Sequence, residues 1–216
     1  MKKFILTTLA CANILCSCKA QDIQLPAPDM KQASMSVVEA LNTRHSVREY
    51  SDRKLTNQEL SNLCWAAFGV SRDTEHRTAP TAMNRKEIRL FAFTDKAVYE
   101  YKAVENCLKH IADGDHRKLV AGASNGRGFV QEFVTTAPVS LVMVIDYEMF
   151  GSSDQRALMM GCVDAGNVSE NINLYCQAVG MVTVPRATMD VEGIRQLLGM
   201  GEKQLPIMNN PVGFPK

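Results

Sequence analysis

Five consecutive residues combine side chains that proteins use to bind phosphate. They read Arg44-His45-Ser46-Val47-Arg48, and we call them the Arg44–Arg48 segment. Arginine gives paired, charge-assisted hydrogen bonds to phosphate oxygens, and a serine hydroxyl adds a neutral donor. Taken alone, the segment fits two interpretations: a phosphate-binding site, or a basic turn that faces solvent.

Other residues with chemical potential do not form a recognisable pattern. His76, His110 and His116 are scattered and lack the spacing of metal ligands on a helix. The glycines between Gly122 and Gly128 match neither a Walker loop nor a dinucleotide fingerprint, so a surface loop is expected there. No serine lies in a nucleophile elbow. We therefore predict no catalytic side chain and no metal site.

The overall composition is that of a globular protein with one domain. The 216 residues are 46% hydrophobic and 22% charged, which suits a single domain with a sizeable core. The formal net charge is +1 and only 6% of the residues are aromatic. Neither a basic excess nor a set of stacking platforms is present, so we expect no nucleic-acid partner.

The first 20 residues have the pattern of a signal peptide. Lys2-Lys3 precedes an apolar run, Phe4 to Leu15, that is too short to span a membrane. In one interpretation Leu15-Cys16-Ser17-Cys18 is a lipobox and Cys18 is the lipidated first residue; in the other, cleavage falls before Gln21. We favour the lipoprotein, because lipoprotein processing selects leucine three residues ahead of the cysteine. An exported protein is expected, periplasmic or anchored to a membrane only through lipid on Cys18.

Four cysteines follow the leader: Cys64, Cys107, Cys162 and Cys176. They are far apart and lie in apolar surroundings, and four cysteines do not make a disulfide scaffold in a domain this large. Buried free thiols are expected.

Two helices should flank the Arg44–Arg48 segment. From Ser34 the pattern is helical, with Met35, Val38 and Leu41 on one face. A capping box at Thr56-Asn57-Gln58-Glu59 opens the second helix. We divide the chain into a signal peptide (1–20), a linker or arm (21–34) and one domain (35–216).

The middle of the chain alternates between strands and irregular segments. Ile88 to Phe93 reads as a strand with Val98 to Tyr101 as its hairpin partner, and Val139 to Ile145 suits a central buried strand. The polar stretch Val104 to Ala112 is expected to be helical. Gly114 to Gly128 is expected to be a loop with broken helical turns.

The longest helical pattern runs from Leu158 to Val179, with Gly180 at the residue that ends it. It is apolar or small on most faces, so it is either a central core helix or part of a subunit interface. A short strand (181–184), a helix capped by Asp190 and an extended tail (204–214) complete the chain. The mixture predicts an α+β fold.

Several short motifs, in their order, resemble the nitroreductase family of FMN enzymes. The Arg44–Arg48 segment with Tyr50 resembles the family's arginine-(arginine or histidine)-serine-x-(arginine or lysine)-x-aromatic signature. Four further segments follow in the family's order: Pro80-Thr81-Ala82-Met83-Asn84; Asp164-Ala165-Gly166 with Asn171, Leu174, Ala178 and Gly180; Val184-Pro185-Arg186-Ala187; and Pro211-Val212-Gly213-Phe214-Pro215. The resemblance covers roughly Val37 to the C-terminus.

This resemblance implies a nitroreductase-like α+β fold, with a mainly antiparallel central sheet wrapped by helices. It also implies an intertwined homodimer that holds FMN at its interface. By the resemblance, Arg44 and Ser46 hold the phosphate and ribityl chain with His45 between them, and Arg48 lies near the pyrimidine edge of the ring. A fixed cation there would stabilise the negative charge of the reduced flavin.

The resemblance assigns further cofactor contacts in three places. Pro80, Thr81, Ala82 and Asn84 form a segment at the ring, where Asn84 matches a hydrogen-bonding amide. Pro185, Arg186 and Ala187 match the loop whose backbone reaches the ring. Lys216 is the candidate for a second phosphate anchor.

The implied function is an FMN-dependent oxidoreductase with ping-pong electron transfer. Electrons would pass from a reduced donor, NAD(P)H, to a small organic acceptor such as a nitroaromatic or a quinone. The flavin does the chemistry and the protein orients and tunes it. Two alternatives stay open: a flavin-dependent oxidase or dehydrogenase of a small or peptide substrate, and a lipid-anchored flavin-binding protein without turnover.

Overall fold

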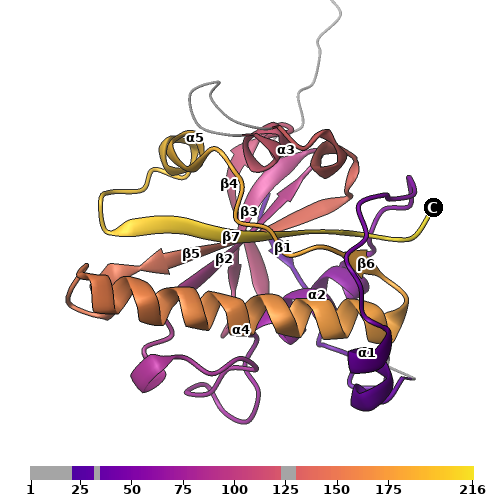
Figure 1. Ribbon diagram of the computed structural model, residues 1–216, viewed down its shortest axis with the longest axis horizontal. Coiled ribbons are helices and arrows are strands. Elements are labelled where there is room, and N and C mark those ends of the chain that lie inside the picture. The colour runs from indigo at the N-terminus through magenta and orange to yellow at the C-terminus, as the bar shows by residue number, and fades with distance from the viewer. Residues whose placement is uncertain (1–20, 32–34, 123–129) are drawn as a thin grey trace, which may run out of the picture.

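One antiparallel sheet lies between two layers of helices (Figure 1). The computed structural model describes residues 21–31, 35–122 and 130–216. Seven strands pair in the order β1-β4-β3-β2-β5-β7-β6, and their pairings are antiparallel. The predicted α+β class and the antiparallel sheet wrapped by helices are confirmed.

The strands of this sheet are β1 (Ile23–Gln24), β2 (Ile88–Thr94), β3 (Ala97–Lys102), β4 (Cys107–Asp113), β5 (Val139–Asp146), β6 (Val182–Thr183) and β7 (Gln204–Gly213). The α-helices are α1 (Val37–Thr43), α2 (Asn57–Phe68), α3 (Arg117–Ala121), α4 (Gln155–Val179) and α5 (Val191–Leu197). Short 3-10 helices are η1 (Ala82–Asn84), η3 (Glu132–Thr136) and η4 (Tyr147–Met149). The β2–β3 hairpin and the interior position of β5 agree with the sequence predictions.

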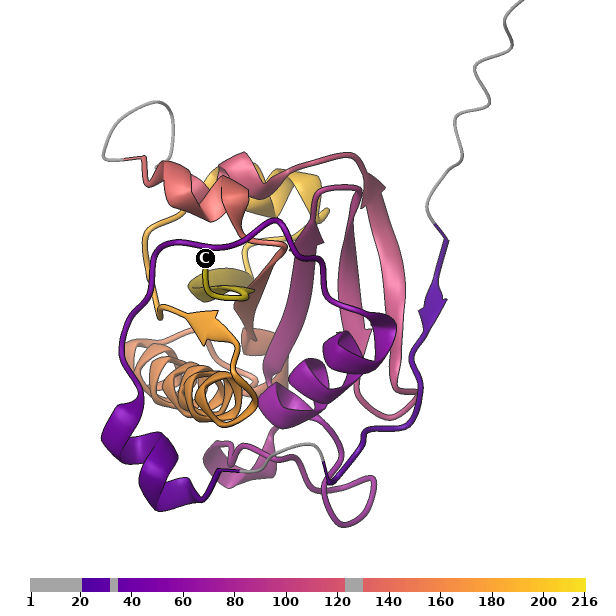
Figure 2. The ribbon, with the colours of Figure 1, turned by 90° about the vertical axis from the view of Figure 1, so that its right-hand side faces the viewer.

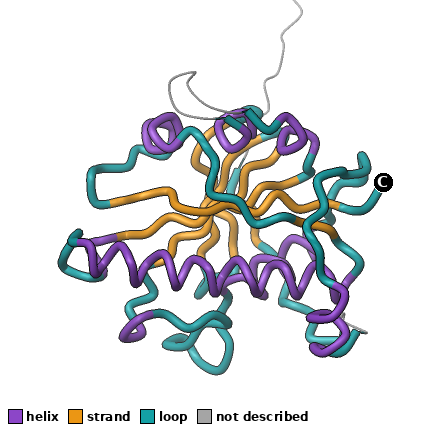
Figure 3. The backbone as a smooth tube through the Cα atoms, viewed as in Figure 1, coloured by secondary structure: helices purple, strands orange, loops and turns teal. Residues whose placement is uncertain are grey.

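Both faces of the central strands are buried, because alternate side chains enter two different cores. In β2, Leu90 and Ala92 pack with α2 and α4, whereas Phe91 and Phe93 pack with α3 and α5. Figure 3 shows the strands enclosed between these helical layers. Burial on both faces explains why the sequence of β5 is an unbroken apolar run.

Helix α4 spans the sheet and has well-defined ends. The Asp154 side chain accepts a hydrogen bond from the Ala157 amide (2.9 Å), and Gly180 closes the helix with a left-handed φ of 75°. Near the middle of its first half, Gly161 lies against Ile145 of β5, where a Cβ atom would be 2.7 Å from the Ile145 Cδ1 atom. The predicted long helix is thus confirmed, and a glycine sets its approach to the sheet.

The predicted capping box of α2 is present, with Thr56 and Glu59 exchanging side-chain and backbone hydrogen bonds. Helix α1 has a second capping box, formed by Ser36 and Glu39. The apolar face predicted for α1 does not enter the core, because Val38 is 75% exposed and Leu41 is 57% exposed. This face therefore has no cover within the described residues.

The helix predicted over Val104 to Ala112 is wrong. A turn follows β3, with Asn106 at a φ of 46°, and residues 107–113 form strand β4 between β3 and β1. The strand is polar because much of it is only partly buried. Its sequence therefore lacks the alternation of apolar and polar residues that predicts a strand. The stretch predicted as a loop with broken turns contains α3, and residues 123–129 lie outside the described residues.

The arm expected before the domain packs against it over its described residues, 21–31. Strand β1 joins the sheet beside β4, Leu25 is buried, and the Ser61 hydroxyl donates to the Pro26 carbonyl (2.6 Å). Pairing and burial therefore make this arm an edge of the fold. None of the described helices is both long enough and apolar enough to cross a bilayer.

All four cysteines beyond the leader are free thiols, as predicted. Cys64 and Cys176 are buried, whereas Cys107 and Cys162 are partly exposed. Burial raises the pKa of Cys64 to about 12, so this thiol is unreactive.

Candidate functional site

The Arg44–Arg48 segment is an extended connection that lies along the end of the sheet. The Arg44 amide donates to the Ala40 carbonyl and ends α1, and the Val47 amide donates to the Thr183 carbonyl of β6 (3.0 Å). Beyond it, the Ser51 amide donates to the Phe214 carbonyl (2.9 Å), and Figure 2 shows the chain after α1 passing the C-terminal end of β7. Backbone contacts fix the segment and leave its polar side chains directed outward.

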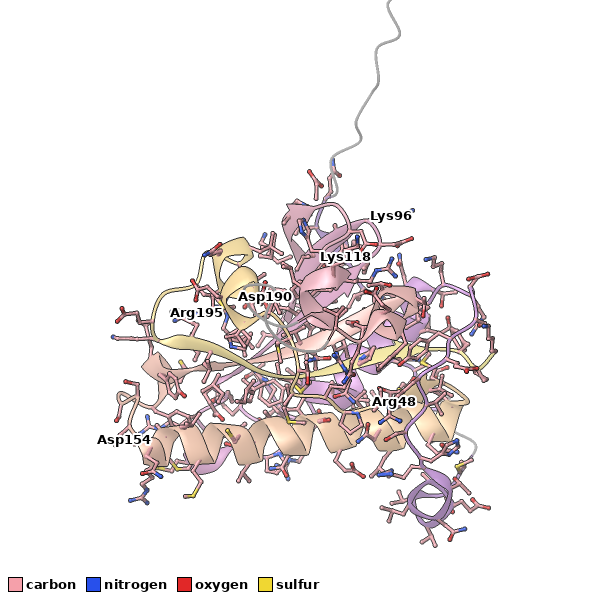
Figure 4. All side chains as sticks on the ribbon, turned by 45° about the horizontal axis from the view of Figure 1, so that its top comes forward. Arg48, Lys96, Lys118, Asp154, Asp190 and Arg195 are labelled. Carbon is pink, nitrogen blue, oxygen red and sulfur yellow. The ribbon has the colours of Figure 1, made fainter. Side chains whose placement is uncertain are left out.

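A hollow lies between this segment and the C-terminal half of α4. Its lining comes from the segment (Arg44, His45, Ser46, Val47), from α4 (Asn173, Cys176, Gln177) and from the β6 region (Met181, Val182, Thr183, Pro185). Arg48 follows directly along the segment but is not part of this lining; Figure 4 labels it on the connection after α1. The structure thus gathers the first four members of the Arg44–Arg48 segment at the hollow and leaves Arg48 outside its lining.

The two arginines of this segment are not neutralised by an ion pair within the described part of the chain. Neither Arg44 nor Arg48 forms an ion pair with any residue that the structure describes. The Nδ1 atom of His45, which is exposed, lies 3.0 Å from the Thr43 carbonyl oxygen. An unpaired guanidinium beside a hydroxyl at a hollow, with a second unpaired arginine nearby in the chain, forms a site that attracts and orients an anion.

A buried polar network holds the rear of the hollow. The Asn210 amide donates to Asn173 Oδ1 (3.1 Å) and to Thr183 Oγ1 (3.3 Å), and the Ser169 hydroxyl donates to Asn210 Oδ1 (2.8 Å). Satisfied buried polar groups of this kind fix neighbouring elements in one arrangement. The sequence analysis missed Asn173 and Thr183; the available signal was polar residues inside an otherwise apolar helix and strand.

The segment from Pro80 to Asn84 lies at a second, open hollow of about 580 Å³. Its lining is Ser71, Arg72, His76, Arg77, Thr78, Ala79, Pro80, Thr81 and Asn84. Met83 and Asn84 adopt left-handed backbone conformations, with φ values of 53° and 52°. Such conformations are costly for residues other than glycine and are concentrated at functional sites.

A single chain does not bring the two hollows together. The first hollow includes Asn173 to Gln177 of α4, whereas the second segment contacts α4 at Asp164, which accepts from the Ala82 amide (2.6 Å). The nine helical steps from Asp164 to Asn173 span about 14 Å along a helix axis. The two segments that the resemblance assigns to one cofactor therefore contact different parts of α4.

The family model for the nitroreductase family matches residues 41–214. This match covers most of the chain, including both hollows and the central helix. The chain belongs to the nitroreductase family. The family is one of oxidoreductases, and membership accounts for the ordered motifs and for the antiparallel sheet.

Individual relatives of this nitroreductase-family chain agree with that membership. A Methanocaldococcus jannaschii protein described as a nitroreductase is 27% identical over 201 residues, which are 88% of this chain and 96% of the relative. A crystal structure described as a nitroreductase from Ralstonia eutropha JMP134 superposes with a TM-score of 0.80 at 28% identity, covering 91% and 90% of the two chains. A Methanothermobacter thermautotrophicus relative, named for NADH dehydrogenase or NAD(P)H nitroreductase activity, is 24% identical over 87% of this chain and 81% of its own.

In this nitroreductase-family chain, the Arg186 side chain is engaged within the fold, and its predicted place in the loop at the flavin ring stays a prediction. Its guanidinium points into the protein, donating to Asn209 Oδ1 (2.6 Å), to the Val120 carbonyl (3.0 Å) and to Gln131 Oε1 (2.7 Å). Its amide also donates to the Asn209 carbonyl (2.8 Å). Because these contacts engage both the side chain and the amide in the fold, Pro185 and Ala187 are the exposed members of this loop.

The charge of Arg186 is buried without a carboxylate partner among the described residues. Burial lowers the pKa of its guanidinium to about 10, and three neutral acceptors hold it in place. The role that fits these contacts is to join β7, α3 and the residues before η3.

Lys216 is exposed and lines neither hollow, so its role as a phosphate anchor stays a prediction. Within the described ranges, no group of three or more histidine, cysteine, aspartate and glutamate side chains is arranged to hold a metal ion.

Proposed function

We propose that this protein is an FMN-dependent oxidoreductase that transfers electrons from NAD(P)H to a small organic acceptor, such as a nitroaromatic or a quinone. The observation that carries the proposal is the hollow beside α4, which is lined by the unpaired guanidinium of Arg44 with His45 and Ser46, while a second unpaired arginine, Arg48, follows two residues further along the chain. A phosphate ester is the part of FMN that such donors bind best. Membership of the nitroreductase family supports the assignment to the oxidoreductases.

The residues present suit the phosphate end of FMN. Arg44 and Ser46 would hold the phosphate and the ribityl chain, with His45 as an exposed neighbour that can add a hydrogen bond. Arg48 would place a fixed positive charge near the ring, where negative charge develops on reduction. When bound, FMN supplies the two-electron chemistry, so no side chain has to act as a nucleophile.

We further propose that a second copy of the chain completes the site. The segment from Pro80 to Asn84 and the Arg44–Arg48 segment lie at separate places on α4 within one chain. Exposed apolar side chains on α1 and α4 give a second copy a surface to cover: Val37, Val38, Leu41, Met159 and Val163. A homodimer would bury them and bring motif segments from two chains together.

Export is also part of this proposal. Residues 1–20 have the pattern of a signal peptide, with Cys18 as the favoured lipidation position, and they lie outside the described residues. The proposed location is periplasmic, either free or attached to a membrane through that lipid.

The function is tested by reducing the flavin-loaded protein with NADH or NADPH in the absence of oxygen. On reduction, we expect the protein to lose the absorbance band at about 450 nm that oxidised flavin gives. Adding a quinone or nitroaromatic should restore the band. Reduction by dithionite but by neither nicotinamide would contradict the proposed donor. Faster recovery with oxygen than with any organic acceptor would favour an oxidase.

A further inference from the structure

The loop from Pro80 to Lys86 is held in a conformation that costs free energy. Met83, Asn84 and Lys86 all have positive φ values (53°, 52° and 55°). Each left-handed residue that is not glycine costs about 1–2 kcal/mol, so contacts elsewhere must hold the loop. Its surface contacts include an ion pair between Lys86 and Glu75 (2.7 Å).

One contact of the loop reaches a buried side chain of the central helix. The Ala82 amide, at the start of η1, donates to Asp164 Oδ2 (2.6 Å). Asp164 lies on α4 and is only 4% exposed, so water competes little for this hydrogen bond. The position of the loop therefore depends on the position and charge of the Asp164 carboxyl group.

Asp164 has a second carboxyl group as its neighbour. Glu87, the residue before β2, is fully buried, and no donor of the described residues reaches either of its side-chain oxygens. Two carboxyl groups form a hydrogen bond only when they share a proton. Burial and the adjacent Asp164 carboxyl raise the pKa of Glu87 to about 8, which is consistent with a shared proton at neutral pH.

Charged groups on the surrounding elements do not neutralise this pair. Lys86 is paired with Glu75, and Arg89 of β2 is paired with Glu100 of β3 (2.8 Å). On β5, Asp146 accepts from the Glu148 amide and from the Gln204 side chain. Loss of the shared proton would therefore leave two negative charges in the core with no described cation to balance them.

We propose that Glu87 and Asp164 are a proton-sharing positioning pair that holds the Pro80–Lys86 loop in its flavin-binding conformation. Glu87 donates to Asp164, and Asp164 accepts from the Ala82 amide. When the pair loses its proton, repulsion between the carboxylates displaces Asp164 and releases the loop. The link to flavin rests on the proposed function; the hold on the loop does not.

The first test measures the dissociation constant of FMN from the full chain between pH 6.5 and 9.5. We expect affinity to weaken above pH 8 by up to about tenfold per pH unit, because one proton is linked to the binding conformation. Glu87→Gln keeps a hydrogen-bond donor to Asp164 but cannot titrate, so its profile should be flat. Glu100→Gln removes another buried carboxyl, and this control should keep the wild-type step.

The second test follows the loop in the flavin-free full chain. Trypsin cleaves after Arg85 and Lys86, and mass spectrometry identifies those cuts. Relative to Glu87→Gln at the same pH, wild-type cleavage there should rise about tenfold between pH 7 and 9. Equal cleavage of the two proteins at every pH would overturn the positioning pair. A cleavage step without FMN binding at any pH would overturn the proposed function while supporting the pair's hold on the loop.

Discussion

At the scale of single residues, two buried glutamates show how their neighbours decide their charge. Glu100 is paired with Arg89 and Lys102 at 2.8 Å each, and these cations lower its pKa against the opposing effect of burial. Glu87 has another carboxyl as its neighbour, so burial and that carboxyl act together and raise its pKa to about 8. Similar burial therefore gives one ionised and one protonated side chain.

The raised pKa of Glu87 predicts how stability changes with pH. The ordinary pKa of 4.5 applies to the unfolded chain, so the native protein holds an additional proton between about pH 5 and 8. The favourable contribution is complete below pH 4.5 and is lost as pH rises toward 8. Over this window, the free energy of unfolding of wild type should fall relative to Glu87→Gln by on the order of 1 kcal/mol per pH unit.

Urea denaturation of both proteins from pH 5 to 8 measures this difference. Parallel pH profiles for wild type and Glu87→Gln would show that Glu87 titrates normally.

A functional residue can be predicted from the sequence when its partners lie close to it along the chain. Arg44, Ser46 and Arg48 lie within five residues, so the sequence showed a candidate anion site, although their residue types alone fitted a basic turn as well. Glu87 and Asp164 meet only because β2 and α4 pack together, and nothing beside Glu87 in the sequence reports a second carboxyl. The inward direction of Arg186 also depends on a distant partner, Asn209.

At the scale of elements, the sequence predicted what local rules control. The caps of α2 and α5, the left-handed Gly180 and the apolar strand β5 follow from short patterns, and the structure contains them. Strand β4 did not follow, because its register is set by β3 and β1 rather than by its own periodicity. The exposed face of α1 was likewise beyond local rules, since only packing decides what covers a helix.

Two glycines of α4 give a paired prediction about helix packing. A Cβ at Gly161 would lie 2.7 to 2.9 Å from Ile145, whereas one at Gly166 meets nothing within 4 Å. We expect Gly161→Ala to destabilise the protein by about 1 kcal/mol, since overpacking of about 1–3 kcal/mol outweighs the gain in helix propensity. Gly166→Ala should be neutral or stabilising by up to about 1 kcal/mol.

Thermal unfolding of both variants checks this pair. Equal midpoints would mean that α4 does not closely approach β5 at Gly161.

At the scale of the whole molecule, exposed apolar side chains on α1 and α4 are the surface that we propose a second copy covers. Val38 is 75% exposed on α1 and Val163 is 60% exposed on α4. We predict that the wild type elutes as a dimer in gel filtration. Val38→Asp combined with Val163→Asp should dissociate it and weaken flavin binding, because charges at an apolar interface are left without partners.

Val104→Asp is the matched control, since Val104 is 55% exposed in the turn between β3 and β4. This variant should stay dimeric. A monomeric wild type that retains flavin would contradict the proposal that two chains complete the site.

The central claim, that the Arg44–Arg48 segment binds the FMN phosphate, is tested most directly by comparing FMN with riboflavin, which lacks the phosphate. The wild type should bind FMN far more tightly than riboflavin. Arg44→Ala combined with Ser46→Ala should weaken FMN binding about 100-fold or more, since each charge-assisted hydrogen bond contributes about 1.5–3 kcal/mol. Riboflavin affinity should fall much less, because riboflavin can lose only the ribityl contact, so the preference for FMN should shrink. Equal wild-type affinity for the two flavins, or an unchanged preference for FMN in the variant, would contradict the claim.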